Sequence, residues 1–322
     1  MGCVVASATW EQETTQSTAG LFTLIHLINM GQSAPEPQPP PPEFDRPWRN
    51  MNWGNKDELE KKLRNFNINQ SSVQFIRILL VGDVGAGKSS FINSVNNAFQ
   101  GRITSLSLAD ATGGTSFTKK YKTCHIEGKD GSPLPFIFND VMGLETGDAG
   151  AHLQDIINAL KGFLQEGYDF ENKSTECMNS PGYRSNPSLD DQIYCLVNIM
   201  AANTVTQMSP EVIMKMKKIR EAAARLDIPQ AIIMTKPDLA CPLVHGDLRK
   251  IYTSKKIKEK MEVCRNLVGV PMNHIFPVKS YHEEMDTDDD MDTLILKALD
   301  QIVNITYDAM KNKAPNSHDE SV

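Results

Sequence analysis

The sequence predicts an α/β fold in which a mostly parallel sheet is covered by helices on both faces. Between residues 56 and 311, apolar β-type segments alternate with amphipathic helical segments, which is the pattern of a parallel sheet. Residues 193–197 and 231–234 lack polar alternation, as expected for strands buried on both faces. In addition, residues 82–89 read Gly-Asp-Val-Gly-Ala-Gly-Lys-Ser between an apolar strand and a helix. Together these observations predict a P-loop nucleotide-binding fold.

The elements are predicted in order from side-chain periodicity. Helices are expected where apolar residues recur every three or four positions, and strands where short runs of β-branched and aromatic residues are bounded by turn residues. This gives, in chain order, a helix at 56–66, a strand at 75–81, a helix at 88–98, strands at 121–127 and 134–139, a helix at 150–165, a strand at 192–199, a helix at 209–226, a strand at 230–235, a helix at 253–268, a strand at 274–278 and a helix at 291–311. The polar segment 166–190 is expected to be an insertion loop.

Residues 1–43 differ in composition from the rest and are predicted to form a variable, disordered region with a proline-rich linker. We place the domain boundary at the end of this linker. A nucleotide-binding domain is then predicted at 44–312, and a disordered tail at 313–322.

The start Met1-Gly2-Cys3 is typical of acylated proteins, although Ala6 stands where the acylation motif has Ser or Thr. We expect contact with a membrane only if Gly2 and Cys3 are acylated.

Composition excludes several classes of function. The 322 residues carry a formal net charge of −7 and a pI of about 5.6, which argues against non-specific nucleic-acid binding. The six cysteines include no C-x-x-C pair, so neither a zinc site nor a disulfide framework is indicated. No apolar run approaches the ~20 residues of a membrane-spanning helix. These features predict a cytoplasmic protein.

The glycine-rich segment 82–89 predicts a phosphate-binding loop. Glycines let the chain wrap closely, so that backbone N–H groups and the start of the next helix point at phosphate oxygens. Lys88 is expected to reach the β- and γ-phosphates, and the Ser89 hydroxyl to ligate Mg²⁺. The nucleotide-binding residues predicted here are Gly82, Asp83, Gly85, Ala86, Gly87, Lys88, Ser89 and Ser90.

A second motif follows the strand at 134–139. Asp140 stands at the carboxyl end of that strand, where open α/β sheets place their sites, and is predicted to hold Mg²⁺ through water. Gly143 is predicted to bring its backbone N–H close to the γ-phosphate. A threonine upstream of Asp140 is expected to close over the metal. The preferred candidate is Thr115, with Thr112 and Thr118 as alternatives.

A third motif, Thr235-Lys236-Pro237-Asp238, follows the strand at 230–235 and bears on the base. The Asp238 carboxylate can accept hydrogen bonds from N1–H and the 2-amino group of guanine together, an arrangement that adenine does not offer. A buried carboxylate left unpaired against adenine would cost on the order of 1–3 kcal/mol. Thr235 replaces the usual asparagine, and its hydroxyl can still tie the loop together.

The Lys236 stem can lie along the base plane, and Ser280, after the last strand, is predicted to offer its backbone amide to guanine O6. These residues predict a G-domain-like site for GTP or GDP with Mg²⁺. Leu144 stands where many small GTPases carry the glutamine that orients water, and Glu145 follows it. Because leucine cannot orient water and no arginine can be assigned to the γ-phosphate, we expect slow or partner-dependent hydrolysis.

The motifs resemble those of the interferon-induced protein 44 and 44-like family. The resemblance is carried by Phe44–Arg49, Arg77–Val95, Asp140–Leu144 and Phe276–Tyr281, and it spans roughly residues 44–312. It implies an interferon-inducible, guanine-nucleotide-binding protein of immune or antiviral defence in the cytoplasm.

Two other functions are left open by the sequence. An interaction scaffold with a degenerate nucleotide site is one, and a P-loop kinase of a small substrate is the other. The kinase would need a lid with arginines, and the insertion 166–190 offers only Arg184. Partners other than the nucleotide, including a second copy of the chain, are also open.

Overall fold

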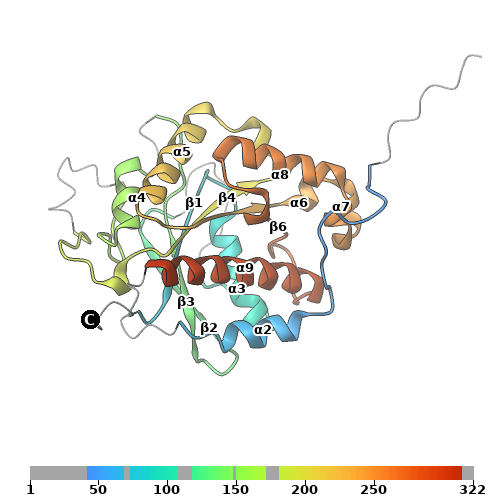
Figure 1. Ribbon diagram of the computed structural model, residues 1–322, viewed down its shortest axis with the longest axis horizontal. Helices are drawn as coiled ribbons and strands as arrows, with labels where there is room; N and C mark the ends of the chain where they lie inside the picture. Colours follow the sequence, from blue (N-terminus) through green and yellow to red (C-terminus); the bar gives the residue numbers. More distant parts are fainter. Residues whose placement is uncertain (1–41, 69–72, 108–117, 148–149, 172–180, 314–322) are drawn as a thin grey trace, which may run out of the picture. The chain divides into compact units, whose positions relative to one another are not determined.

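The computed structural model describes residues 42–68, 73–107, 118–147, 150–171 and 181–313, which lie in the compact unit beginning at Pro42. A six-stranded sheet has the order β2-β3-β1-β4-β5-β6 (Figure 1). All neighbouring strands are parallel except β2 and β3, which form an antiparallel hairpin. This confirms the predicted α/β fold with its mostly parallel sheet. The strands are β1 (Ile76–Gly82), β2 (Lys122–Glu127), β3 (Pro133–Asp140), β4 (Cys195–Ala201), β5 (Gln230–Thr235) and β6 (Ile275–Val278).

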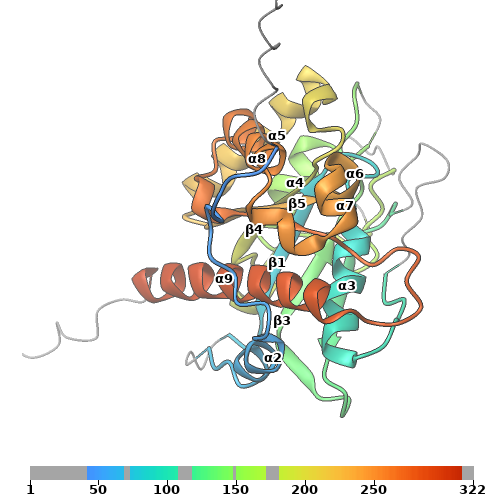
Figure 2. The same cartoon turned by 90° about the vertical axis from the view of Figure 1, so that its right-hand side faces the viewer.

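Helices cover both faces of the sheet because each central strand sends alternate side chains into two separate cores. In β1, Ile78 and Leu80 belong to one core, whereas Leu79 and Val81 belong to the other. Figures 1 and 2 show the two groups of helices on opposite sides of the sheet. The first core is closed by α2 (Lys56–Arg64), α3 (Lys88–Gln100) and α9 (Asp289–Lys313), and the second by α4 (Leu153–Leu160), α5 (Pro210–Arg225) and α8 (Lys255–Val268).

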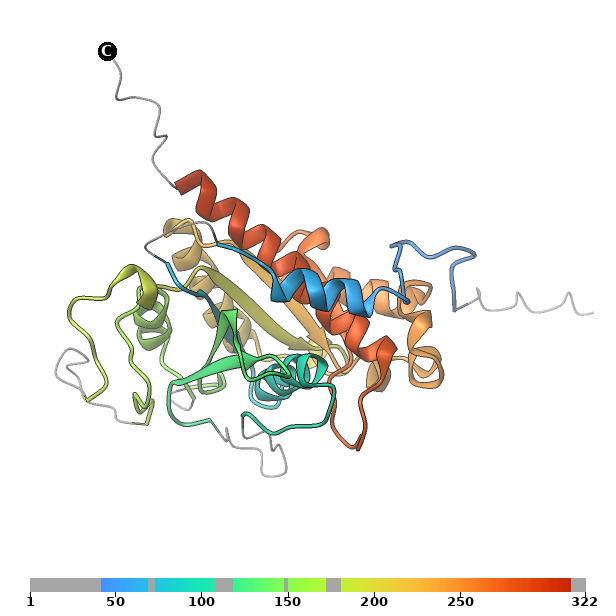
Figure 3. The same cartoon turned by 90° about the horizontal axis from the view of Figure 1, so that it is seen from below.

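Charge complementarity fixes α2 against α9, and the two helices lie side by side in Figure 3. Lys56 at the start of α2 lies 2.7 Å from a carboxylate oxygen of the buried Asp292, and Lys62 pairs with Asp300 further along. Leu59 and Leu63, which lie between these two lysines around the helix, are buried in the core. The short helix is thus held by both apolar burial and ion pairs.

Arg49 fastens the start of the described chain to the edge of the sheet. Its two terminal nitrogens donate to the carbonyl oxygens of Ile275 and Met272, each at 2.8 Å. The guanidinium also lies 5.1 Å from the ring centre of Trp48 and 5.4 Å from that of Tyr252. A planar cation beside aromatic rings combines hydrogen bonds with cation–π attraction. One residue therefore connects the segment before α2 to β6.

Two elements differ from the sequence prediction by three or more residues at a boundary. The strand predicted from residue 192 begins at Cys195 because residues 189–191 form a 3₁₀ turn, whose Asp191 and the preceding Ser188 cap each other. The helix predicted at 150–165 covers only Leu153–Leu160. It ends there because Gly162 has a φ of +83°, and a Cβ on this residue would lie 2.7 Å from a backbone oxygen. A local capped turn therefore decides the first boundary, and close approach of another backbone decides the second.

The prediction also missed two short helices after β5, α6 (Pro237–Ala240) and α7 (Pro242–Gly246), each of which begins with proline in its first turn. None of the helices in the described ranges is both long and apolar enough to cross a membrane. The cysteines within those ranges are free and buried, namely Cys124, Cys195, Cys241 and Cys264.

Candidate functional site

The glycine-rich turn connects β1 to α3 at the carboxyl edge of the sheet. Gly82 ends β1 so close to β4 that a Cβ on it would lie 2.3 Å from the Ile199 carbonyl oxygen. Gly85 and Gly87 have φ values of +71° and +98°, which L side chains rarely adopt. Gly87 also precedes the first residue of α3, so the free N–H groups of the helix begin at the loop. The predicted phosphate loop therefore has the backbone that such a loop requires.

Lys88 lies beneath this loop and is buried. Its ammonium donates to the carbonyl oxygens of Gly82 and Asp83, each at 3.2 Å. Burial lowers the pKa of Lys88, and the nearby Asp140, Asp83 and Glu145 oppose that effect. The Lys88 side chain is therefore poorly solvated, and a phosphate would be a strong partner for its charged form.

Asp140, the last residue of β3, is buried beside the first turn of α3. Its Oδ2 atom accepts hydrogen bonds from the hydroxyls of Ser89 at 2.7 Å, Ser107 at 3.3 Å and Thr118 at 3.4 Å. Its Oδ1 atom is buried and has no hydrogen-bond partner among the described residues. A buried carboxylate oxygen surrounded by hydroxyls fits a hard divalent cation such as Mg²⁺.

The residues of the described ranges form no cluster of three or more His, Cys, Asp or Glu side chains that could hold a metal. A cation at Asp140 would therefore depend on this one carboxylate, on hydroxyls and on oxygens from a bound phosphate. Thr115, the preferred threonine of the sequence analysis, and its alternative Thr112 lie outside the described residues. The other alternative, Thr118, lies 3.5 Å from the Ser89 hydroxyl.

Gly143 contacts the phosphate loop directly. A Cβ on Gly143 would lie 2.5 Å from Val84 Cγ2 and 2.9 Å from its Cα, so only glycine fits between the two segments. The next backbone N–H, of Leu144, donates to Gly82 O at 3.0 Å. The Leu144 side chain is fully buried in the core. Leu144 thus serves packing, and its side chain does not face the loop.

The residues after Leu144 are held on α5. Lys215 donates from its ammonium to the carbonyl oxygens of Glu145 at 2.7 Å and Gly147 at 2.8 Å. Glu211, one turn earlier on α5, accepts from the Gly147 N–H at 2.6 Å. The Glu145 side chain is half-buried and contributes to the field at Lys88. From the sequence, Lys215 begins a basic helical face that predicts solvated lysines, whereas in the structure its ammonium is held by these two backbone oxygens.

The end of β5 is tied to the same loop. Thr235 is buried and its hydroxyl donates to Ala86 O at 2.6 Å. Lys236 has a left-handed φ of +55°, and its ammonium donates to Gly85 O at 2.9 Å. Asp238 follows in the first turn of α6 and is partly exposed. The motif after β5 and the phosphate loop are therefore parts of one arrangement.

Ser280 and Ser90 are the remaining predicted residues. Ser280 follows β6, and its hydroxyl oxygen is buried without a hydrogen-bond partner among the described residues. Ser90, on α3, accepts at its backbone oxygen from the Ser94 hydroxyl, which in turn accepts from the N–H of Tyr281, next to Ser280. The loop after β6 is thus connected to the helix that follows the phosphate loop.

Sequence reasoning missed Ser107 and Asn93. Ser107 contacts Asp140 from 33 residues away, and no spacing rule signals such a contact.

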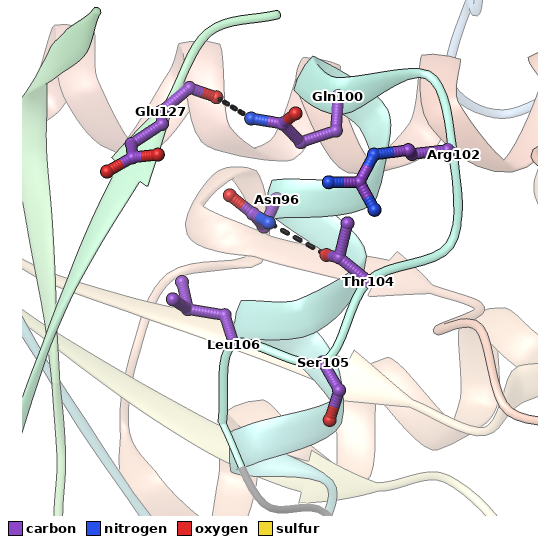
Figure 4. Close-up of a pocket in the computed structure, with 7 residues that line it drawn as sticks. All are labelled: Asn96, Gln100, Arg102, Thr104, Ser105, Leu106 and Glu127. Carbon is purple, nitrogen blue, oxygen red and sulfur yellow. Dashed lines mark hydrogen bonds between the residues drawn. The ribbon is translucent and has the colours of Figure 1, made fainter. Parts of the chain in front are cut away.

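An open pocket lies further along α3, between that helix and residues 102–106, and Figure 4 shows Asn96 and Gln100 among the side chains that line it. This pocket includes none of the predicted site residues.

Comparison with known proteins points to one group of relatives. No protein-family model matches the chain. Interferon-induced protein 44 of Homo sapiens is 35% identical over 245 residues, which cover 76% of this chain and 55% of the relative. The Mus musculus protein of the same name is 36% identical over 248 residues, covering 76% and 58%. Interferon-induced protein 44-like of Homo sapiens is 29% identical over 259 residues, covering 80% and 57%. The chain thus spans a little over half the length of these relatives.

Solved structures with a similar arrangement are more distant. Toc33 from Arabidopsis thaliana, in complex with GDP and Mg²⁺, shares 13% identity with a TM-score of 0.46 over 81% of this chain and 97% of its own. Era, in complex with MgGDPNP and ribosomal RNA, shares 12% identity with a TM-score of 0.36 over 74% and 57%. At this similarity the function is better judged from the site and from the sequence relatives.

Proposed function

This chain belongs, over the three quarters of its length that match, to the family of the interferon-induced protein 44 and 44-like proteins, and on that premise we propose that it binds guanine nucleotides with Mg²⁺ in the interferon response. It hydrolyses GTP slowly or with the help of a partner. From the names of the relatives, the same proposal includes a role in antiviral or immune defence and a location in the cytoplasm.

One observation carries this proposal, namely the connection between the motif after β5 and the phosphate loop. Thr235 and Lys236 each donate to a loop carbonyl, although they follow it by about 150 residues in the chain. A residue that recognises a base must be held at a fixed distance from the phosphates, because the nucleotide has one length. These two hydrogen bonds set that distance and support a single nucleotide site.

Asp238 supplies the preference for guanine. Its carboxylate follows Lys236 by two residues and keeps part of its surface exposed, which leaves it accessible to a ligand. A carboxylate accepts two hydrogen bonds from N1–H and the 2-amino group of guanine. Adenine has an acceptor at N1 and no 2-amino group, so it would leave the carboxylate unpaired. The loop after β6, with Ser280, lies next in the sheet order and completes the base side of the site.

The phosphate side is built from residues of three segments. Lys88 places its charge beneath the loop, and the Ser89 hydroxyl and the free Oδ1 of Asp140 are oxygens suited to Mg²⁺. When bound, Mg²⁺ neutralises negative charge on the phosphates. Gly143 keeps its backbone within contact distance of the loop, so its N–H can reach a terminal phosphate.

Slow turnover follows from the packing of Leu144. Its side chain is buried in the core and its backbone N–H is used by Gly82. Neither group can orient an attacking water. Glu145 is the nearest carboxylate to follow, and its negative charge would face a phosphate of the same sign. Full catalysis would then need a group from a partner or from a second copy of the chain.

The kinase alternative is less well supported. Arg184, the arginine that the insertion offers for a lid, pairs with Asp191. Its backbone N–H also donates to the carbonyl of Phe163 at 2.7 Å, which fixes this segment beside α4. A scaffold with an empty site would not need the hydrogen bonds of Thr235 and Lys236 to the loop for nucleotide binding. The experiment below distinguishes a scaffold from a nucleotide-binding protein.

Calorimetric titration with GTP, GDP and ATP in Mg²⁺ tests the proposal. We expect GTP and GDP to bind and ATP to bind about 5- to 150-fold more weakly, because the loss of one paired carboxylate is worth about 1–3 kcal/mol. Lys88→Ala should abolish binding of all three nucleotides. Asp238→Ala should lower affinity for GTP and raise that for ATP, because no carboxylate is then left unpaired against adenine. Glu262→Ala, which removes an exposed carboxylate on α8, is the matched control. Equal binding of ATP and GTP would refute guanine specificity, and no binding would favour the scaffold.

A further inference from the structure

We propose that Ser107 is a positioning residue of the magnesium site, where its hydroxyl orients the Asp140 carboxylate, and that Asn93 holds Ser107 in place. This inference rests on the proposed function, because the cation arrives with the nucleotide. Ser107 lies outside the sequence motifs, and neither residue was predicted from the sequence to belong to the site.

Asn93 binds the backbone of Ser107 on both sides. Its Nδ2 donates to Ser107 O at 2.8 Å, and its Oδ1 accepts from Ser107 N–H at 2.7 Å. Two hydrogen bonds from one planar amide fix both the position and the direction of a residue. Ser107 is only 1% exposed, so water does not compete for these bonds. Asn93 stands four positions after Ser89 on α3. The residue that holds Ser107 therefore lies on the same rigid helix as a predicted metal ligand.

This fixed position directs the Ser107 hydroxyl at one particular oxygen. It donates to Asp140 Oδ2 at 3.3 Å, whereas Oδ1 is buried and unpartnered among the described residues. Ser89 and Thr118 also contact Oδ2. Both of these hydroxyls are candidates to ligate the cation through their oxygen atoms. The O–H bond of a hydroxyl that ligates a cation is restricted in direction, so it is less free to donate to Oδ2. Ser107 is then the donor that keeps Oδ2 occupied and Oδ1 directed into the site.

Other contacts hold the same stretch of chain without involving the site. Asn97 Oδ1 accepts from Thr104 N–H and from its hydroxyl, each at 2.7 Å, and Asn96 donates to the Thr104 hydroxyl at 2.7 Å (Figure 4). Lys122 donates to Leu106 O at 2.8 Å. The path of residues 102–106 is therefore secured independently of Asn93. A role of Asn93 and Ser107 at the metal can be separated from a role in loop structure.

A second neighbour of the Ser107 hydroxyl is the buried thiol of Cys124, whose pKa is raised to about 12 by burial. The thiol is a weak acceptor and stays protonated at neutral pH, so it competes poorly with a carboxylate for the hydroxyl proton. The charged acceptor decides where the proton points.

The test measures how tightly GTP binds as a function of Mg²⁺ concentration, and its affinity in EDTA, for full-length wild type and variants. Ser107→Ala should raise the Mg²⁺ concentration for half-maximal tightening roughly tenfold, which is the usual effect of losing a hydrogen bond to a charged group. Affinity in EDTA should stay unchanged. Asn93→Ala should shift the Mg²⁺ requirement in the same direction. Asn96→Ala and Ser105→Ala are the controls, since they alter the same segment without touching Ser107.

A merely structural role of Ser107 would change the affinity in EDTA and in Mg²⁺ by the same factor, or change neither, and either result would overturn the inference. If Asn93→Ala fails to fold, Ser107→Ala decides alone, because it deletes one oxygen and leaves both Asn93 contacts to the backbone. Wild-type protein whose GTP affinity does not respond to Mg²⁺ would overturn the metal part of the proposed function and this inference with it. A failure confined to the variants overturns the inference only.

Discussion

The hydroxyl of Thr235 donates a hydrogen bond of 2.6 Å to the carbonyl of Ala86, 149 residues earlier in the chain. Thr235 ends β5 and Ala86 lies in the glycine-rich turn after β1, with β4 between the two strands. Both groups are buried, so neither has water as an alternative partner. The contact spans the centre of the sheet edge and connects the two halves of the proposed nucleotide site.

Removing this hydroxyl should weaken the site without destroying the fold. We expect Thr235→Val, which keeps the shape of the side chain, to lower GTP affinity several-fold and stability by about 1–3 kcal/mol, because Ala86 O loses its donor. Titration calorimetry and chemical denaturation measure the two effects. Thr235→Ser retains the hydroxyl and should bind as the wild type does. If Thr235→Val binds GTP normally, the bond does not position the base-binding motif.

Asp238→Asn should change the preferred base. An amide can donate to the C2 carbonyl of xanthine, where guanine has an amino group that only an acceptor satisfies. We therefore expect GTP affinity to fall by at least tenfold and that for xanthosine triphosphate to rise above the wild-type value. Competition binding with both nucleotides measures the ratio. An unchanged ratio would show that Asp238 does not touch the base.

Introducing glutamine at position 144 should fail to accelerate hydrolysis. Because the Leu144 side chain is fully buried, Leu144→Gln places an amide in the core instead of beside a phosphate. Burial of an unpaired amide is expected to cost about 1–3 kcal/mol of stability. Single-turnover GTP hydrolysis and thermal melting measure the two quantities, and Leu144→Met is the apolar control. A tenfold or greater rate increase for the glutamine variant would contradict the packing argument.

Arg49→Ala should destabilise the folded chain by about 2–3 kcal/mol, since it removes two charge-assisted hydrogen bonds and the cation beside Trp48 and Tyr252. Urea denaturation measures this loss. Arg49→Lys keeps the charge but cannot reach both carbonyls, so it should lie between wild type and alanine. Arg46→Ala, an exposed arginine in the same segment, is the control. Equal free energies of unfolding for all four proteins would mean that the contacts of Arg49 do not stabilise the fold.

Glu284 should contribute stability that depends on pH. Burial by itself would raise the pKa of Glu284, but hydrogen bonds from the His282 N–H and from Lys279 outweigh it and lower that pKa to about 2. A carboxyl group whose pKa is lowered from 4.5 stabilises the fold above pH 4.5 and loses this effect as the pH falls towards 2. Glu284→Gln should therefore flatten the decline in melting temperature across this range. Glu283→Gln, an exposed neighbour, should leave the decline unchanged.

Much of the fold could be predicted from the sequence because its signals are local. The apolar runs that became β1, β3 and β5 are short and bounded by turn residues, and the glycines of 82–89 specify a turn that few other sequences allow. Boundaries were most in error where a capped turn or a close backbone contact intervenes. Cys195 starts β4 late because of a capped turn, and Gly162 ends α4 early because another backbone lies against it.

By itself the sequence determined which residues stand at the carboxyl ends of the strands, and thus Lys88, Asp140 and Asp238 as candidates for phosphate, metal and base. Tertiary structure decided which of these groups meet and how. The hydrogen bond of Thr235 to Ala86, the burial of Leu144 and the contact of Ser107 with Asp140 join segments that are far apart in the chain. Such contacts depend on the order of strands and on the direction of each side chain, and neither follows from the spacing of residues along the chain.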